Sequence, residues 1–269
     1  MPSNHPIGIF DSGIGGLTVL RHIRSLLPHE SISYVADRGF IPYGNKTDDF
    51  IYARVHNITD FLLKNSAKAI VVACNTATAA AIHQLRQRFD VPIIGMEPGV
   101  KPAIQVSRNG NIGVLATAGT LGSDKFKDLI ERHANGAELF IKPCHGWVEH
   151  IEAGDLTELE TMNMIQTTLS PLLERRVDTL VLGCTHYPFL TQQIKALAGE
   201  EVDIVDTGYA VATQLKRRLE ENDLLSTSSE PGNERFWSSG PLDEMRELLR
   251  RFWAQEADLE TLPDQANLS

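Results

Sequence analysis

The 269-residue sequence contains only three cysteines, and none of them forms a CxxC pair. This count makes a disulfide framework improbable and leaves each cysteine as a candidate reactive thiol. No stretch approaches the roughly 18 apolar residues of a membrane span, and residues 1–6 lack the pattern of a signal peptide. We therefore expect a cytoplasmic protein without a membrane segment.

Basic residues are also scarce, because 25 Lys and Arg face 35 Asp and Glu, which gives a formal net charge of -10. Binding to nucleic acid needs clustered Lys and Arg, and the chain has no basic run longer than the three residues at 216–218. A small anionic ligand remains possible, because backbone amides and hydroxyls at helix N-termini can bind carboxylates. The 42% hydrophobic and 22% charged residues are ordinary for a folded globular protein.

Short apolar runs alternate with segments of helical periodicity, which is typical of βα units around a parallel sheet. This pattern predicts an α/β fold. The expected strands are Ile7–Phe10, Ile32–Ala36, Ala69–Ala73, Ile93–Met96, Ile112–Ala116, Glu138–Ile141, Thr179–Leu182 and Val202–Val205. The expected helices are Leu17–Leu27, Asp49–Lys64, Ala77–Phe89, Ser123–Glu131, Leu156–Arg175 and Pro188–Ala198. Near the C-terminus we expect a connector at 224–233, a helix over Asp243–Glu256 and a frayed end over 258–269.

The two halves of the chain show an internal repeat. The strand at Ile7–Phe10 has a counterpart at 112–115, and the segment Ile70–Thr76 matches Leu180–His186. In both members of the second pair an apolar strand is followed by one small residue, a cysteine and a turn with a hydroxyl group. Because ligands of open α/β sheets bind beyond the carboxyl ends of the strands, the repeat predicts that Cys74 and Cys184 line one cleft between two facing halves. Either cysteine alone is more simply interpreted as a buried small hydrophobe.

Four further segments carry polar or flexible residues at expected turns or helix starts. The loop 11–16, DSGIGG, could hold a carboxylate or phosphate on its amides, or could simply be a tight turn with Asp11 or Ser12 capping the helix. It lacks the Walker lysine and the GxGxxG spacing. Pro42–Gly44 could project its tyrosine into a cleft. Residues 75–76 and 185–186 stand at expected helix starts, where they could bind an anion, cap the helix or do both.

Taken together, the segments DSGIGG at 11–16, PYG at 42–44, ACNT at 73–76 and GCTHYP at 183–188 resemble the motif set of the glutamate racemases in order and spacing. The similarity extends through 113–120, 144–152, 206–208 and 236–240, and so covers roughly residues 6–255. It implies two pseudo-symmetric α/β domains with the active site in the cleft between them. One domain would be 1–97 plus 207–269, with Cys74, and the other 98–206, with Cys184.

The resemblance also implies an activity and a set of site residues. The enzyme would interconvert L- and D-glutamate without a cofactor or metal, and would supply D-glutamate for peptidoglycan and hence for cell-wall biogenesis and cell shape. It would be a cytoplasmic protein that commonly self-associates, for which we expect a homodimer. Cys74 and Cys184 would be the catalytic acid/bases, with Asp11 beside the first thiol and Glu152 and His186 beside the second. The substrate would be bound by Asp11, Ser12, Tyr43, Gly44, Asn75, Thr76, Thr117, Thr120, Thr185 and His186.

The chain departs from the family pattern before Glu152, where residues 144–145 read Cys-His and 148–152 read VEHIE. The choice of Glu152 over Glu149 therefore depends on register alone. Cys144 matches a position without a catalytic role and is interpreted as a packed thiol. His145 and His150 have no assigned role.

Racemisation removes the α-proton from one face and returns a proton to the other, which two bases achieve without moving across the carbon. One cysteine must begin as a thiolate and the other as a thiol, and a helix N-terminus favours the thiolate. No pyridoxal lysine motif or metal cluster is evident in the sequence, so amides and hydroxyls around the α-carboxylate must stabilise the carbanion.

Three alternatives remain open from the residues. An aspartate racemase would use the same two thiols. A hinged amino-acid-binding module would use its cysteines only for structure. A thiol hydrolase or amidotransferase would need a single Cys-His pair and would leave the second cysteine unexplained.

Overall fold

The computed structural model describes residues 3–134, 136–253 and 257–263, and its strands form two parallel sheets. The chain divides into two compact units. Unit 1 comprises residues 1–96 and 208–269, and unit 2 comprises residues 97–207. The predicted α/β fold with mainly parallel sheets is thereby confirmed.

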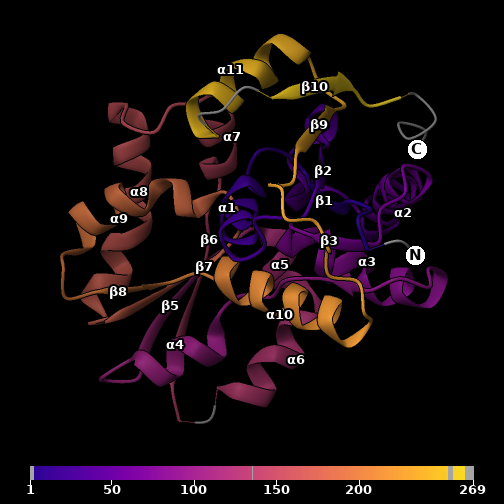
Figure 1. Ribbon diagram of the computed structural model, residues 1–269. Coiled ribbons are helices and arrows are strands. Elements are labelled where there is room, and N and C mark those ends of the chain that lie inside the picture. The colour runs from indigo at the N-terminus through magenta and orange to yellow at the C-terminus, as the bar shows by residue number, and fades with distance from the viewer. Residues whose placement is uncertain (1–2, 135, 254–256, 264–269) are drawn as a thin grey trace. The chain divides into compact units, whose positions relative to one another are not determined.

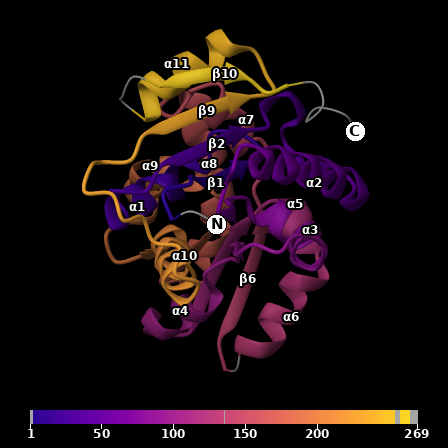
Figure 2. The same ribbon diagram turned by 45° about the vertical axis from the view of Figure 1, so that its right-hand side comes forward.

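The sheet of unit 1 has six strands in the order β10-β9-β2-β1-β3-β4. Every pair of neighbours is parallel, and Figure 2 shows β9 between β2 and β10. The strands are β1 (Ile7–Asp11), β2 (Ile32–Ala36), β3 (Ala69–Val72), β4 (Ile93–Ile94), β9 (Glu234–Ser238) and β10 (Asp258–Thr261). Residues of β1, β2 and β3 are buried throughout, as expected for parallel strands that are covered on both faces.

The helices of unit 1 follow its strands along the chain, and Figure 1 shows α1 beside α10. They are α1 (Leu17–Leu26), α2 (Asp48–Lys64), α3 (Asn75–Arg88), α10 (Gly208–Glu221) and α11 (Leu242–Phe252), with the 3-10 turns η1 (Arg38–Phe40) and η2 (Tyr43–Asn45). Thr47 caps α2 by accepting a hydrogen bond from the N–H of Phe50.

Unit 2 has a four-stranded parallel sheet in the order β6-β5-β7-β8. Its strands are β5 (Asn111–Ala116), β6 (Glu138–Pro143), β7 (Thr179–Gly183) and β8 (Asp203–Val205). Its helices are α4 (Val100–Val106), α5 (Ala118–Gly122), α6 (Asp124–His133), α7 (Trp147–Glu152), α8 (Leu159–Glu174) and α9 (Thr191–Ala198), with the 3-10 turn η3 (Tyr187–Leu190).

The order β2-β1-β3-β4 in unit 1 recurs as β6-β5-β7-β8 in unit 2, so the structure contains the predicted repeat. Two glycines occupy equivalent places in it. Gly8 pairs with Ile70, and Gly113 pairs with Leu180. A Cβ at either glycine would lie within 3 Å of the paired side chain, at 2.8 Å from Ile70 Cδ1 or 2.6 Å from Leu180 Cδ2. The absence of a side chain therefore lets the central strands of both sheets approach closely.

The structure corrects three expectations about the elements. A frayed end was expected over 258–269, and this expectation is wrong for 258–261, which form β10 beside β9. Residues 264–269 lie outside the described residues. The helix expected over Asp243–Glu256 is α11 and ends at Phe252, and 254–256 are likewise not described. The helix expected from Pro188 begins as η3, and α9 starts only at Thr191.

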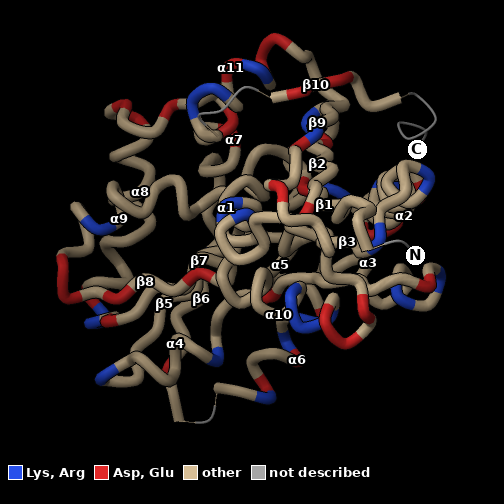
Figure 3. The backbone as a smooth tube through the Cα atoms, in the orientation of Figure 1, with Lys and Arg blue, Asp and Glu red and all other residues tan. Residues whose placement is uncertain are grey.

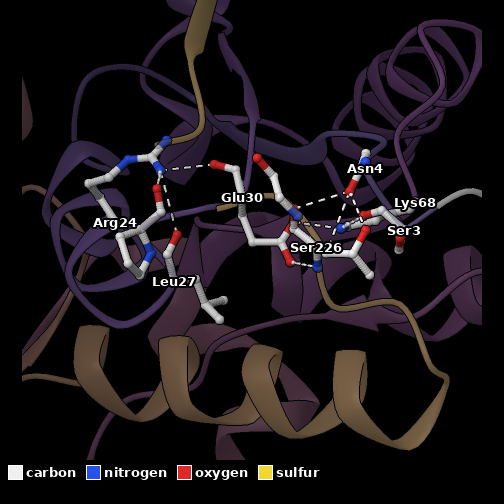
Figure 4. A network of polar contacts seen from close by, with 10 residues as sticks. Ser3, Asn4, Arg24, Leu27, Glu30, Lys68 and Ser226 are labelled. Carbon is white, nitrogen blue, oxygen red and sulfur yellow. Dashed lines mark hydrogen bonds and ion pairs between the residues drawn. The ribbon is translucent and has the colours of Figure 1, made fainter. Parts of the chain in front are cut away.

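A buried polar network joins three distant segments of unit 1 (Figure 4). The Lys68 ammonium pairs with the Glu30 carboxylate at 2.5 Å and also donates to the carbonyl of Ser3. The N–H of Ser226 donates to the other oxygen of Glu30 at 2.8 Å, while Arg24 donates to the Glu30 carbonyl at 2.9 Å. The network ties the N-terminal segment and the connector after α10 to the turn before β2.

Candidate active site

Each sheet reverses its direction of strand addition beside its first strand, which is where α/β proteins bind ligands. In unit 1 the reversal lies between β1 and β3, whose carboxyl ends lead to Asp11 and Cys74. In unit 2 it lies between β5 and β7, whose carboxyl ends lead to Thr117 and Cys184. The repeat therefore places the two cysteines at equivalent positions, one in each unit.

Cys74 is the N-cap residue of α3. Its sulfur accepts a hydrogen bond from the N–H of Ala77 at 3.4 Å and lies 3.9 Å from the hydroxyl oxygen of Ser12. The side chain is buried, with 5% exposed. Because an N–H donor and the positive end of the helix dipole both stabilise negative charge, this position favours a thiolate.

Asp11 closes the loop 11–16 onto itself. Its Oδ2 accepts the N–H of Gly16 at 2.8 Å, and the Tyr34 hydroxyl donates to the carbonyl of Gly13 at 2.9 Å. A Cβ at Gly16 would lie 2.7 Å from Tyr34 Oη, so the close turn requires glycine. One loop amide is therefore bound by the Asp11 carboxylate, which agrees with the tight-turn interpretation of this loop.

Asn75 is a buried polar residue directly after Cys74. Its side chain is buried, with 4% exposed, yet neither its amide nitrogen nor its amide oxygen has a hydrogen-bond partner among the described residues. Leaving such groups buried and unpaired is costly. The first residue of α3 therefore offers a donor and an acceptor directly beside the Cys74 thiol.

Tyr43 lies in η2 and is buried, but its hydroxyl donates to Asp37 Oδ2 at 2.5 Å. Burial raises the pKa of Tyr43 well above its usual value, and the negative charges of Asp37 and Cys74 raise it further. The phenol is thus neutral and acts as a donor to Asp37. Gly44 follows in the same turn. Ser12, which follows Asp11, and Thr76, which is two residues after Cys74, are both buried.

In unit 2 three side chains form a buried chain that ends at a thiol. Cys184 Sγ lies 3.8 Å from His186 Nδ1, and His186 Nε2 lies 2.8 Å from Glu152 Oε1. Cys184, His186 and Glu152 are 7%, 1% and 8% exposed. This geometry lets the carboxylate orient the imidazole and lets the imidazole exchange a proton with the thiol.

The structure distinguishes between the two candidate glutamates of α7. Glu152 lies on the buried side of this short helix, where it contacts His186, whereas Glu149 is exposed. Trp147 and Ile151 bury the same side of α7. Register in the sequence had favoured Glu152, and the packing of α7 places it beside His186.

Cys184 differs from Cys74 in one respect that the sequence did not predict. It precedes a 3-10 turn, for which His186 is the N-cap residue, rather than the first turn of an α-helix. The expectation that Cys184 stands at a helix start is therefore wrong, because the residues of the Tyr187–Leu190 segment close 3-10 hydrogen bonds first. His186 is the group that the structure places beside this thiol.

The hydroxyl residues of unit 2 also lie at the ends of strands. Thr117 follows β5, caps α5 by accepting the N–H of Thr120, and donates its own hydroxyl to Thr120 Oγ1 at 3.0 Å. Thr185 is buried directly after Cys184. N-capping is thus shown for Thr117.

Cys144 is the third free cysteine, and it is buried after β6. Burial raises the pKa of its thiol far above the usual range, and the neighbouring charge of Cys184 raises it further. Tyr187 donates its hydroxyl to the carbonyl of Cys144 at 3.4 Å and stacks edge-on against Trp147 at 4.9 Å between ring centroids. Cys144 thus remains a neutral packed thiol, as interpreted from the sequence, and all three cysteines are free of disulfides.

Two residues near Cys74 escaped the sequence analysis. Asp37 directly follows β2, a position at the carboxyl end of a strand that could have been noticed, and it is fully buried. Arg54 is fully buried within α2 and binds Asp37 through Nε at 2.9 Å and Nη2 at 2.5 Å. An arginine inside a helix is usually exposed, so nothing in the sequence signalled this contact.

Comparisons with known proteins agree with this geometry. Residues 18–215 match the family model of the Asp/Glu/hydantoin racemases. The chain belongs to this racemase family. It is therefore an isomerase.

The glutamate racemase of Methylococcus capsulatus is 53% identical to this racemase over 261 residues, which is 97% of this chain and 96% of the relative. The crystal structure of glutamate racemase isoform RacE1 from Bacillus anthracis superposes with a TM-score of 0.86 at 32% identity, and covers 97% of this chain and 98% of that chain. The Escherichia coli glutamate racemase, in complex with L-glutamate and the activator UDP-MurNAc-ala, gives a TM-score of 0.85 at 32% identity and covers 96% of this chain and 98% of that chain.

Two properties of the racemase concern metals and membranes. In the ranges that the structure describes, no three His, Cys, Asp or Glu side chains gather as a metal site would require. None of the described helices combines the length and apolar character of a membrane span.

Proposed function

We propose that this racemase interconverts L- and D-glutamate, with Cys74 and Cys184 acting on opposite faces of the same α-carbon. The observation that carries the proposal is the equivalent placement of the two thiols at the carboxyl ends of β3 and β7, beside the reversal point of each sheet. The relatives that cover nearly the whole chain are glutamate racemases, and one was crystallised with L-glutamate.

Each thiol has its own means of handling a proton. Cys74 as a thiolate would be stabilised by the N–H of Ala77 and the α3 N-terminus. Cys184 as a thiol would donate its proton to the carbanion and be left as a thiolate beside His186, which Glu152 orients. The two cysteines exchange protonation states at every turnover. The enzyme that has released D-glutamate therefore carries the thiol proton on a different cysteine from the enzyme that has released L-glutamate.

Charge that develops on the α-carboxylate needs donors that are already in place. The unpaired Asn75 amide, Ser12, Thr76 and the main chain of Gly44 would supply them in unit 1, and Thr117, Thr120 and Thr185 in unit 2. Asp11 would bind the ammonium group or relay a proton, because a bare anion beside Cys74 disfavours its thiolate. No step requires a group beyond the side chains and the main chain of the protein.

An aspartate racemase would use the same two thiols, so a comparison of the two substrates tests the assignment to glutamate. Purified protein that converts aspartate faster than glutamate under matched conditions would refute the assignment to glutamate.

We further propose that the enzyme works in the cytoplasm as a homodimer and supplies D-glutamate to peptidoglycan. Figure 3 shows both basic and acidic residues on α10 and on α11, which favours a small-molecule substrate over a nucleic acid.

Proton exchange in deuterated water tests the two-base chemistry directly. Each enantiomer of glutamate is incubated with the enzyme without added cofactor, and deuterium at Cα is followed in substrate and product at low conversion. Two distinct bases place deuterium in the product enantiomer, whereas the remaining substrate keeps its protium. Equal incorporation into the substrate would indicate one mobile base and would contradict the proposal.

A further inference from the structure

A series of polar contacts runs through the apolar core beside Cys74. The Tyr43 hydroxyl donates to Asp37, and Asp37 accepts two further hydrogen bonds from the Arg54 guanidinium. That guanidinium lies 3.9 Å from the centre of the Phe40 ring, within cation–π distance. Arg54 and Asp37 have no exposed surface, and Tyr43 is 1% exposed.

Such a buried ion pair is weak as a source of stability, because desolvation of both charges offsets their attraction. Apolar residues of similar size at positions 37 and 54 would complete the core of α2 at less cost. The pair therefore calls for a role beyond packing. Its two-pronged geometry, which arginine provides and lysine does not, fixes the direction of the Asp37 carboxylate.

Unit 1 contains a second buried ion pair, Glu30–Lys68, whose contacts account for a different role. That pair binds the N-terminal segment and the connector at Ser226. Arg54 and Asp37 make a different set of contacts. Their contacts lead to the carboxyl end of β2, where the Asp37 N–H donates to the Asp11 carbonyl at 2.9 Å, and to Tyr43.

Tyr43 in turn belongs to the same buried cluster as Cys74. The negative charge of Cys74 contributes to the raised pKa of Tyr43, so the phenol lies within electrostatic reach of the thiol. Because its proton is donated to Asp37, the direction of the Tyr43 ring depends on where Arg54 holds that carboxylate. The Pro42–Gly44 turn, which carries Tyr43, is one of the expected substrate-binding segments.

We propose that Arg54 is a positioning residue of the active site, which acts through Asp37 to hold Tyr43 and the 42–44 turn beside Cys74. The proposal rests on the racemase function proposed above, since it concerns the binding of the same glutamate. The hydrogen bonds from Arg54 to Asp37 are the contacts through which it would act.

Kinetics of Arg54→Lys test the proposal, because lysine keeps the charge but cannot bind both carboxylate oxygens in the plane that arginine imposes. We expect KM for glutamate to rise about 10- to 100-fold while kcat changes much less, as small displacements of positioning groups have effects of this size. In the Tyr43→Phe background the same substitution should add almost nothing, because the phenol through which it acts is gone. Independent losses that multiply in the double variant would overturn the proposal.

Hydrogen exchange of the 38–46 segment supplies a readout that does not depend on catalysis. Amide exchange there should be about tenfold faster in Arg54→Lys than in the unmodified chain, because the turn loses its anchor. Lys68→Arg is the matched control, since it alters the other buried cation of unit 1 and should leave both KM and exchange over 38–46 unchanged. Unchanged exchange in Arg54→Lys, or equal effects in Lys68→Arg, would refute the assignment.

The two readouts separate this inference from the proposed function. If the unmodified enzyme fails to racemise glutamate, the function is wrong, yet the exchange comparison still decides whether Arg54 holds the turn. If the enzyme is active and Arg54→Lys leaves KM unchanged, only the role of Arg54 is wrong. Thermal unfolding of each variant identifies one that has merely lost its fold.

Discussion

At the scale of single residues, the two thiols have different surroundings although they occupy equivalent places in the repeat. Cys74 contacts a helix N-terminus and the Ser12 hydroxyl, whereas Cys184 contacts His186 and, through it, Glu152. A helix dipole stabilises a thiolate without exchanging protons, while an imidazole can also deliver one. The two directions of racemisation therefore depend on different auxiliary groups.

Replacing either thiol by a hydroxyl should stop racemisation without preventing binding. A serine hydroxyl stays protonated at neutral pH and therefore cannot replace the thiolate as a base. Cys74→Ser and Cys184→Ser should each lower kcat about 10²- to 10⁴-fold. Calorimetric titration with D-glutamate should still show binding. Activity retained by either single variant would contradict the two-base mechanism, and Cys144→Ser, at the packed thiol, is the control expected to keep turnover.

The two glutamates of α7 offer a matched pair of variants. Glu152→Gln removes the carboxylate that orients His186, and we expect kcat to fall about 10²-fold or more in the direction that uses Cys184 as the base. Glu149→Gln changes an exposed side chain of the same helix and should leave kcat unchanged. Separate rates from L- and D-glutamate make the comparison. A larger loss in Glu149→Gln would reverse the assignment.

At the scale of elements, β7 is held in place at its amino end, the end opposite Cys184. Asp178 precedes β7 and accepts hydrogen bonds from the Ser107 hydroxyl at 2.7 Å and from the N–H groups of Arg108 and Asn109 at 2.8 and 2.9 Å. Burial opposes ionisation, but these bonds and one from Thr179 outweigh it and lower the pKa of Asp178. The carboxylate thereby ties the start of β7 to the loop after α4.

This lowered pKa predicts how stability depends on pH. The ionised carboxyl stabilises the fold above the unfolded pKa of about 3.9, and its contribution is lost as pH falls through the lower folded value. Asp178→Asn should lower the free energy of unfolding by about 1–3 kcal/mol at pH 7. The gap between the two proteins should shrink below about pH 4. Denaturant titrations at pH 7 and pH 3.5 measure it, and a gap that grows in acid would contradict the explanation.

Some strands could be predicted from the sequence and others could not. The strands before Asp11, Cys74, Thr117 and Cys184 are buried apolar runs, and their pattern in the sequence indicated them directly. In contrast, β9 begins with the charged pair Glu234 and Arg235, and β10 has charged residues at alternate positions; β9 becomes a strand by pairing with β2, and β10 by pairing with β9. Their periodicity gives no such signal, because tertiary context determines strand formation at a sheet edge.

At the scale of the whole molecule, the C-terminal part of the chain returns to complete unit 1. Residues 208–269 add α10, α11 and two strands to the sheet that begins with β1. The Glu30–Lys68 pair joins this returning segment to the N-terminal part at Ser226. A Cβ at Gly232 would lie 2.0 Å from the Glu30 carbonyl, so the returning chain also passes very close to this pair.

Breaking the Glu30–Lys68 pair should destabilise the fold without changing the chemistry. Lys68→Met leaves the Glu30 carboxylate buried and unpaired, and we expect the free energy of unfolding to fall by about 3–5 kcal/mol. Lys64→Met removes an exposed pair with Asp60 on α2 and should leave unfolding unchanged. Thermal unfolding and KM for glutamate should be measured together. A shift in KM without loss of stability would show that the pair serves the active site instead.

The sequence by itself determined the α/β fold, the repeat and the residues that follow each central strand, because apolar runs and their punctuation are local signals. It also placed Cys74 at a helix start, and family resemblance connected Glu152 and His186 with Cys184. Only the tertiary structure decided that Glu152 rather than Glu149 contacts His186, and that Arg54 binds Asp37, which also accepts the Tyr43 hydroxyl. The reason is physical: these contacts depend on which side of a helix is buried and on what packs against it, and residues far apart in the sequence determine both.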